Sequence, residues 1–444
     1  MWHHCGIWAK NLAACRFAEA VDGGSLHLVL DHDICDTAMV LPEQNSDGNW
    51  RFERLEIESE QRDVPLEFRQ LPQRTHFRRF VDAVVNARTG QLCAAAWPEC
   101  EMLSNDKISG LNNIAELITY LQSLLNAALG LNIMYLPVSM LSQSDAFVNF
   151  VIPIMVDATG LASSYNSAVS TQIAEQRDNH GGKLRFLLID ITTGLTELPF
   201  WLVSPNGKRG SLCVTVDKTG KIRVGTASNE LGNLDSASQS GKVHQFKQIL
   251  QQSGYRLRPK AVSLTLFVRL FLADWFIHGI GGAFYEGVTD YIIQNYYRKN
   301  ALRFGVATCT MMLPLSNTPG STKDNLSQLK HKLHNIKHGP ERYIEDSVLK
   351  RQPVVSLVRE KEQLIHQATD SSLPSSARRS AWDSLSVINE KLLQYAKGTA
   401  EMLKKRIAEL ETDTISQEAC DHREYFFGIF PKERLDKVAA SVTF

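Results

Sequence analysis

The densest group of residues with chemical potential lies in the segment Phe276–Glu286, FIHGIGGAFYE. Three of its residues are glycines, namely Gly279, Gly281 and Gly282. Closely spaced glycines let a backbone approach a ligand and expose N–H groups to an anion. A helical pattern then starts at Tyr285, and a glycine loop that leads into a helix N-terminus suits a phosphate or carboxylate. His278 and Glu286 add a candidate acid and base, although a tight turn between two buried helices, with His278 as a satisfied core residue, is the alternative.

A second candidate group is Asp31-His32-Asp33, which directly follows the compact apolar run Leu26–Leu30. Ligands of open α/β sheets bind beyond the carboxyl ends of the strands. A histidine between two carboxylates could act as a general base, and the carboxylates could also hold a divalent cation. The alternative is a strand-end cap with solvated acids, and we assign no metal ligands.

The elements around these two groups predict an α/β fold. Leu12–Ala18 has a short helical pattern, Asp22–Gly24 ends it, and the apolar run at residues 26–30 reads as a buried strand, which is half of a βαβ unit. Because strand ends of one parallel sheet share an edge, we expect His32 and Gly281 to line the same pocket.

The remaining segments divide the chain into a core with insertions and a helical region. We expect a Rossmann-like parallel-sheet core over residues 1–320, interrupted by an irregular and helical insertion at 46–110 and a small antiparallel β insertion at 184–227. Residues 321–420 are rich in Lys, Glu, Gln, Leu and Arg and predict an antiparallel coiled-coil hairpin. The aromatic residues of 421–444 predict a tail that packs on the core.

Composition narrows the class of partner. The formal net charge is +0, so no global field favours nucleic acid or an anionic membrane surface. No apolar run is long enough to span a bilayer, and no secretory signal is visible. The eight cysteines form no C-x-x-C pair, which fits a reducing cytoplasm better than a zinc ribbon or a disulfide scaffold. We expect a small-molecule substrate and, through the apolar stripes of residues 325–411, a homodimer.

Several of these motifs together resemble one family. Asp31-His-Asp33 after an apolar strand is similar to the E-D-H-D segment of the bacillithiol biosynthesis cysteine-adding enzymes. Arg258-Pro259, an apolar helix and Gly279-x-Gly281-x-x-x-Tyr285 resemble their R-P…G-P-G-E-x-x-Y segment, and His4-Cys-Gly-Ile-Trp8 resembles the start of their first core helix. The motifs occur in the same chain order and span most of the chain, so the match extends to that family or to an uncharacterised sister family.

The resemblance implies an activity and roles for individual residues. It implies a ligase that forms an amide between cysteine and a glucosamine conjugate, with a nucleotide site for which ATP or ADP is the natural candidate. The catalytic candidates are Asp31, His32, Asp33, His278 and Glu286. The ligand-binding candidates are His4, Gly6, Trp8, Lys10, Asn11, Arg258, Gly279, Gly281, Gly282 and Tyr285.

The sequence also departs from the family pattern. The G-Q-Q loop and its strand have no counterpart, so we expect part of the nucleotide side of the pocket to be incomplete. Gly281-Gly282 stands where the family has Gly-Glu, and Asp31 stands where it has Glu. These departures leave a second hypothesis open, namely a non-catalytic scaffold that binds a nucleotide or another small molecule and dimerises through its coiled coil.

Overall fold

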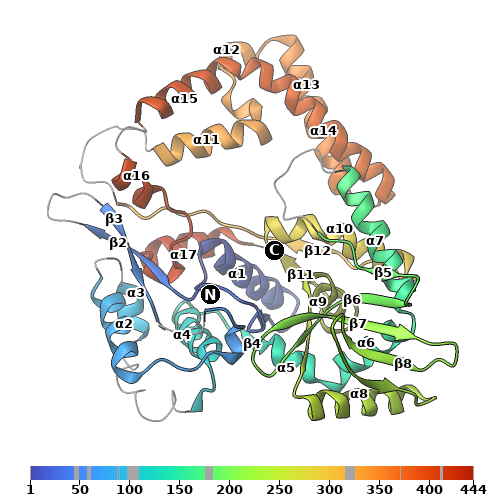
Figure 1. Cartoon of the computed structure of the whole chain (residues 1–444). Helices are drawn as coiled ribbons and strands as arrows, with labels where there is room; N and C mark the ends of the chain where they lie inside the picture. The colour runs from blue at the N-terminus through green and yellow to red at the C-terminus, as the bar shows by residue number, and fades with distance from the viewer. Residues whose placement is uncertain are drawn as a thin grey trace. The chain divides into compact units, whose positions relative to one another are not determined.

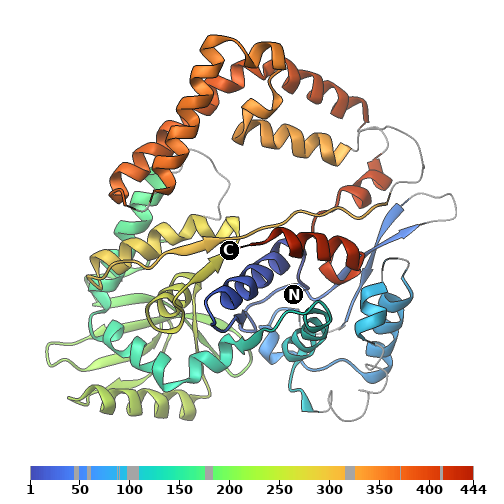
Figure 2. The same ribbon diagram turned by 180° about the vertical axis from the view of Figure 1, so that it is seen from behind.

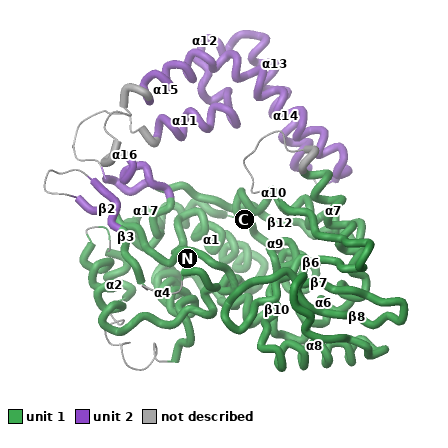
Figure 3. The backbone as a smooth tube through the Cα atoms, viewed as in Figure 1, with its two compact units in different colours: residues 1–41, 54–311, 424–444 green, residues 42–53, 312–423 purple. Residues whose placement is uncertain are grey.

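The chain is a mixed α/β protein with two compact units (Figures 1 and 3). The computed structural model describes residues 2–44, 50–57, 62–87, 89, 91–97, 110–175, 184–315, 326–370, 372–410 and 414–443. Unit 1 comprises Met1–Leu41, Arg54–Met311 and Glu424–Phe444, and unit 2 comprises Pro42–Glu53 and Met312–Arg423. The expected boundary at residues 320–321 lies outside the described residues, as do residues 46–49, 58–61, 88, 90 and 98–109 of the expected insertion at 46–110.

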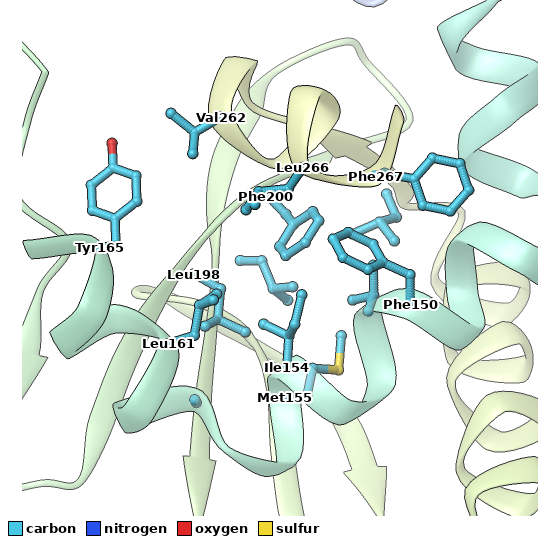
Figure 4. Packing of buried hydrophobic residues seen from close by; sticks show 14 of the residues in the cluster. Phe150, Ile154, Met155, Leu161, Tyr165, Leu198, Phe200, Val262, Leu266 and Phe267 are labelled. Atoms are coloured by element: carbon cyan, nitrogen blue, oxygen red, sulfur yellow. The ribbon is translucent and has the colours of Figure 1, made fainter. Parts of the chain in front are cut away.

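The largest sheet of unit 1 is antiparallel, with strand order β10-β6-β7-β8-β9 and β5 paired to β6. Its strands are β5 (Ile189–Asp190), β6 (Leu195–Val203), β7 (Arg209–Val216), β8 (Ile222–Thr226), β9 (Asn229–Leu234) and β10 (Arg256–Pro259). One face packs on helices α6 (Asp145–Val156), α7 (Ala158–Glu175), α8 (Gln239–Ser253) and α9 (Ala261–Phe267). Phe150, Phe200 and Phe267 meet in this core (Figure 4), with the Phe150 and Phe267 rings 5.4 Å apart.

Unit 1 also contains two pairs of parallel strands. β1 (Leu26–Val29) pairs with β4 (Met134–Pro137), and β11 (Phe276–His278) pairs with β12 (Phe304–Val306). The chain passes from β11 to β12 through α10 (Ile280–Asn295), which makes a βαβ unit. Helix α1 (Cys5–Ala20) contacts both pairs: Asn11 Oδ1 lies 2.7 Å from His27 Nδ1 on β1, and the Phe17 ring lies 4.0 Å from that of Trp275, just before β11.

The apolar run from Ala261 onward differs from the single helix that its composition predicts. Helix α9 gives way to a π-helical turn, Val268–Leu272, and residues 276–278 form β11. Helix α10 begins at Ile280, not at Tyr285, so two of the three glycines form its first turn. Because the first N–H groups of a helix have no partner within it, a glycine-rich first turn leaves them accessible.

The remaining elements of unit 1 surround the N-terminal helix (Figure 2). They are the 3₁₀ turn η1 (Leu66–Phe68), α2 (Arg74–Asn86), α3 (Gln91–Ala96), α4 (Ile114–Ala128), α5 (Val138–Gln143), η7 (Phe427–Ile429) and α17 (Lys432–Ser441). The aromatic segment near the C-terminus belongs to this unit, and Tyr425, Phe427 and Phe430 are fully buried in it. The Phe427 ring stacks on Trp8 of α1 at 5.9 Å.

Unit 2 is mostly helical. Its helices are α11 (Leu326–His338), η6 (Pro340–Tyr343), α12 (Asp346–Leu349), α13 (Gln352–Thr369), α14 (Ser375–Tyr395), α15 (Lys397–Leu410) and α16 (Thr414–Asp421). The strands β2 (Met39–Gln44) and β3 (Trp50–Leu55) pair with each other and run across the unit boundary. Helices α13 and α14 pack together and are joined by a short segment, and Val354, Ile388 and Leu392 lie in their buried core.

No single helix among the described residues is both long and apolar enough to cross a membrane. Helices α6 and α7 together have the length and composition, but the chain bends by 91° between them. Most of their apolar side chains lie in the core of unit 1, which explains why these helices are so apolar.

Candidate functional site

The N-terminus of α10 is the first of two polar groups that contain the residues expected to act in chemistry. Its N-cap residue is Gly279, and no side chain caps the helix. A side chain added at Gly281 would meet nothing within 4 Å, so the space beside the first turn is open. The Lys10 Nζ lies 3.8 Å from the position that a Cβ would take on Gly279. A cation therefore approaches a helix end that already carries partial positive charge.

A chain of polar contacts, in which Arg269 forms ion pairs with Glu286 and Asp290, holds His278 at this helix end. Its Nε2 lies 2.9 Å from Glu286 Oε1, and Glu286 also pairs with the Arg269 guanidinium. Arg269 in turn lies 2.7 Å from Asp290 Oδ1. The side chains of Glu286 and Arg269 are fully buried, whereas that of His278 is 21% exposed. The buried pair thus orients an accessible imidazole, which is the arrangement that a general acid or base requires.

The glycine at position 282 is needed for the His278 ring. A Cβ on Gly282 would overlap His278 Nδ1, so any larger residue there would displace the imidazole. None of Gly279, Gly281 and Gly282 has a positive φ angle, and alanine at these positions would meet no backbone strain. Positions 281 and 282 therefore differ only in the atoms that an added side chain would meet.

The second polar group is built on the Asp31-His32-Asp33 segment after β1. Asp31 is buried and accepts hydrogen bonds from the Ser139 hydroxyl and, at 2.9 Å, from the Ser139 N–H at the start of α5. Burial raises the pKa of the Asp31 carboxyl, and these hydrogen bonds partly oppose the shift. Asp31 therefore joins the loop after β1 to the helix after β4.

A buried ion pair lies next to His32. Arg258 donates from Nε and Nη2 to the two oxygens of Glu67, at 2.7 Å and 2.6 Å, and both side chains are almost fully buried. Arg256 adds a third contact to Glu67 at 3.0 Å. The guanidinium of Arg258, a ligand-binding candidate from the sequence, is thus already paired with a carboxylate of the protein itself. Asp33, the residue after His32, forms a second ion pair, with Arg209 at 2.8 Å.

His32 itself is 8% exposed, and its Nδ1 has no hydrogen-bond partner among the described residues. Burial lowers the pKa of His32 to about 4, with the neighbouring Asp33 acting in the opposite direction. The ring is therefore neutral at pH 7, as a proton acceptor must be, but it is a weak base.

The residues at the start of α1 have mixed surroundings. His4 Nδ1 accepts a hydrogen bond from the Gly6 N–H at 3.0 Å and so caps the helix. Trp8 is buried against Phe427. Asn11 is buried beside His27, while Lys10 reaches toward Gly279.

The structure brings some expected site residues together and keeps others apart. Lys10, Gly279, His278 and Glu286 belong to one neighbourhood, and Asp31, His32, Asp33 and Arg258 belong to another. Within the described residues the two groups share no hydrogen bond or ion pair, so a common pocket for His32 and Gly281 stays a prediction.

The sequence analysis missed Arg269, Asp290, Glu67 and His27. Arg269 and Asp290 gave a signal, because both are charges within the apolar stretch that starts at Ala261. No group of three or more metal-ligating side chains occurs among the residues that the structure describes.

The low pKa of His32 leads to a prediction about acid stability. In the unfolded chain His32 takes up a proton near pH 6.5, whereas in the folded chain its pKa is about 4, so it takes up the proton only near that pH. Folding stability should therefore fall as the pH decreases from 6.5 toward 4. Urea unfolding at pH 7 and pH 5 measures the loss, which His32→Gln should reduce. An equal loss in the variant would show that His32 is not the group responsible.

No family model matches the chain, and no curated protein matches it either.

Proposed function

We propose that the protein is an enzyme of the ligase type that binds a nucleotide through its phosphates at the N-terminus of α10. In this proposal the parallel pairs belong to a Rossmann-like core, and the reaction joins an amino acid to an aminosugar conjugate through an amide. The amino acid is cysteine in the family that the sequence resembles. One observation carries the nucleotide site: a glycine-rich, uncapped helix start within a βαβ unit, approached by the Lys10 ammonium group.

Electrostatics support an anion at this place. The first turn of α10 supplies free N–H groups and partial positive charge, and Lys10 supplies a full charge. Among the described residues Lys10 forms no ion pair, and burial lowers its pKa. A bound phosphate would compensate this charge, whereas water alone leaves the desolvation cost of Lys10 unopposed.

His278 is the best candidate for proton transfer in this reaction. Amide formation requires that an amine lose a proton as its nitrogen attacks an activated carboxyl carbon, while the bond from that carbon to the oxygen of the activating phosphate breaks and the phosphate group leaves with this oxygen. The His278 imidazole, which Glu286 orients, can accept that proton. In the same proposal the second polar group, around His32, shapes the substrate side of the core.

Two alanine substitutions on α10 test the nucleotide site. Gly281→Ala and Gly287→Ala both place a methyl group in open space, so each should stabilise the free protein slightly, by about 0.5 kcal/mol. Only Gly281 lies at the helix start. We expect Gly281→Ala to weaken ADP and ATP binding by about tenfold and Gly287→Ala to leave it unchanged, because only the first methyl group occupies space that the phosphates need.

Calorimetric titration with ADP and with ATP and Mg²⁺, together with melting temperatures, measures both effects. Ligand at 100 times its Kd should stabilise the protein by about 2.7 kcal/mol. Equal nucleotide affinities for Gly281→Ala and Gly287→Ala would place the nucleotide elsewhere. Mass spectrometry of mixtures with cysteine, a glucosamine conjugate and ATP then tests for an amide product.

The scaffold hypothesis also has an observation in its favour. Large apolar side chains on the helices of unit 2 are exposed, including Trp382 on α14 at 59% and Met402 on α15 at 69%. Where such residues form a contiguous patch, they are typical of a surface that packs against a partner. A homodimer through residues 325–411 would cover them, and it is compatible with either hypothesis. Nucleotide binding without any product would favour the scaffold.

A further inference from the structure

A set of polar side chains at the start of α1 has more hydrogen-bonding atoms than partners. His3 and Asn11 are only 8% and 5% exposed. His3 Nδ1 and Asn11 Nδ2 are buried and have no hydrogen-bond partner among the described residues. A buried polar atom without a partner costs about 1–3 kcal/mol, so two such atoms in one cluster of side chains indicate a missing hydrogen-bonding partner.

The side chains of His3 and Asn11 are connected through His27. The His3 and His27 ring centroids are 4.8 Å apart, and His27 Nδ1 lies 2.7 Å from Asn11 Oδ1. If His27 donates its Nδ1 proton to this oxygen, the Asn11 amide is left with a free donor at Nδ2. Lys10 is near enough to both histidines for its charge to lower their pKa values. We call His3, Lys10, Asn11 and His27 the α1 donor cluster.

The charges of the α1 donor cluster are not balanced by an acid. Among the described residues, the groups that act on His3 are the basic groups His27, Lys10 and His4, and the group that acts on His27 is Lys10. No carboxylate of the described residues pairs with Lys10. Lys10 is half-buried, and charges removed from water are normally paired, so this cluster has the character of an anion site.

From this arrangement we infer that the α1 donor cluster binds the carboxylate group of a small ligand. The net charge of the α1 donor cluster decides which class of anion it binds. Burial lowers the pKa values of both histidines, that of His27 to about 4, so at pH 7 both rings are neutral and Lys10 supplies the single cation. One cation with neutral donors matches a monoanionic carboxylate, whereas a phosphate dianion would remain half compensated.

The position of Lys10 connects this subsite with the nucleotide site. Its Nζ lies 3.8 Å from the Cβ position of Gly279 at the start of α10. The inference therefore rests on the proposed function in one respect, namely that the carboxylate belongs to a substrate bound beside the nucleotide phosphates. Lys10 would then lie between two anions and reduce their repulsion. Carboxylate binding by the cluster does not itself require the nucleotide.

The substitution Asn11→Asp tests the subsite with little change of shape. Aspartate keeps an acceptor for His27 Nδ1, removes the free donor and adds a negative charge beside Lys10. We expect acetate and glycine to raise the melting temperature of the unmodified protein relative to sodium chloride at equal ionic strength. Asn11→Asp should weaken acetate and glycine binding by about tenfold or more, because a charged hydrogen bond is lost and a like charge is added.

A second asparagine provides the control. Asn166 exchanges hydrogen bonds with the Leu187 backbone at 2.8 Å and 2.9 Å, outside the α1 donor cluster. Asn166→Asp removes a donor and adds a charge in the same way, but it should leave acetate binding unchanged. The ring signals of His3 and His27 in ¹⁵N-histidine spectra provide a second measurement, since acetate should shift them in the unmodified protein and in Asn166→Asp only.

The outcomes separate this inference from the proposed function. If ADP binds and acetate and glycine do not, the carboxylate subsite is wrong and the nucleotide site stands. If acetate binds, shifts the His3 and His27 signals and is lost in Asn11→Asp, the subsite is supported even when ADP fails to bind. Equal acetate effects in all three proteins would overturn the subsite, because they would show salt effects that do not depend on the cluster.

Discussion

Replacing Glu67 by glutamine is expected to lower the free energy of unfolding by about 3–5 kcal/mol. Glu67 is a buried carboxylate that forms two hydrogen bonds with the buried guanidinium of Arg258 and a further contact with Arg256. Glutamine has nearly the same shape but no charge, so it would leave Arg258 with an uncompensated charge in a region that water does not reach. Denaturant unfolding at pH 7 measures the loss.

An exposed ion pair provides the control for Glu67→Gln. Arg16 and Glu19 are 2.8 Å apart on α1 and are both well exposed to solvent. Glu19→Gln should change stability by less than about 0.5 kcal/mol, because solvent screens such pairs. A similarly small loss for Glu67→Gln would mean that Arg258 is hydrated or finds another partner, and the group around His32 would then be less rigid than its hydrogen bonds indicate.

Local sequence patterns predicted the local elements well. The run at residues 26–30 contains β1 (Leu26–Val29), and the helical pattern at Leu12–Ala18 lies within α1 (Cys5–Ala20). The expectation of an α/β protein is confirmed at that level, and two parallel strand pairs are present. These features depend on neighbours within a few residues, where periodicity and turn residues carry the information.

Contacts between distant parts of the chain could not be predicted in this way. Glu67 and Arg258 are 191 residues apart, and nothing in either local sequence indicates the other. The run after Ala261 has the composition of one long helix, but burial of Arg269 against Glu286 coincides with a π-helical turn and β11 follows. Tertiary contacts overrode helical propensity there. The sequence identified His278 and Glu286 together as a candidate acid and base, but it showed Arg269 only as a charge within an apolar run and did not indicate that Arg269 pairs with Glu286.

The largest expected effect on function is that of His278→Gln on turnover. If amide formation is confirmed, this variant should lower kcat by about 10²–10⁴-fold, because glutamine cannot accept the proton of the attacking amine. Glutamine can still donate a hydrogen bond to Glu286, so the start of α10 and ADP affinity should change little. Steady-state rates and ADP titration together separate the two effects. His76→Gln is the control, since His76 contacts the Glu56 backbone oxygen in a different part of unit 1.

Gly282→Ala tests the same role without removing the imidazole. A methyl group at this position would displace the His278 ring from Glu286, while the methyl group of Gly281→Ala meets no atom. If His278 transfers the proton, Gly282→Ala should lower kcat nearly as much as His278→Gln, whereas Gly281→Ala should act mainly on nucleotide affinity. Full activity in both His278→Gln and Gly282→Ala would exclude His278 as the base. His32, which is neutral at pH 7 and has an unpartnered Nδ1, would then become the candidate.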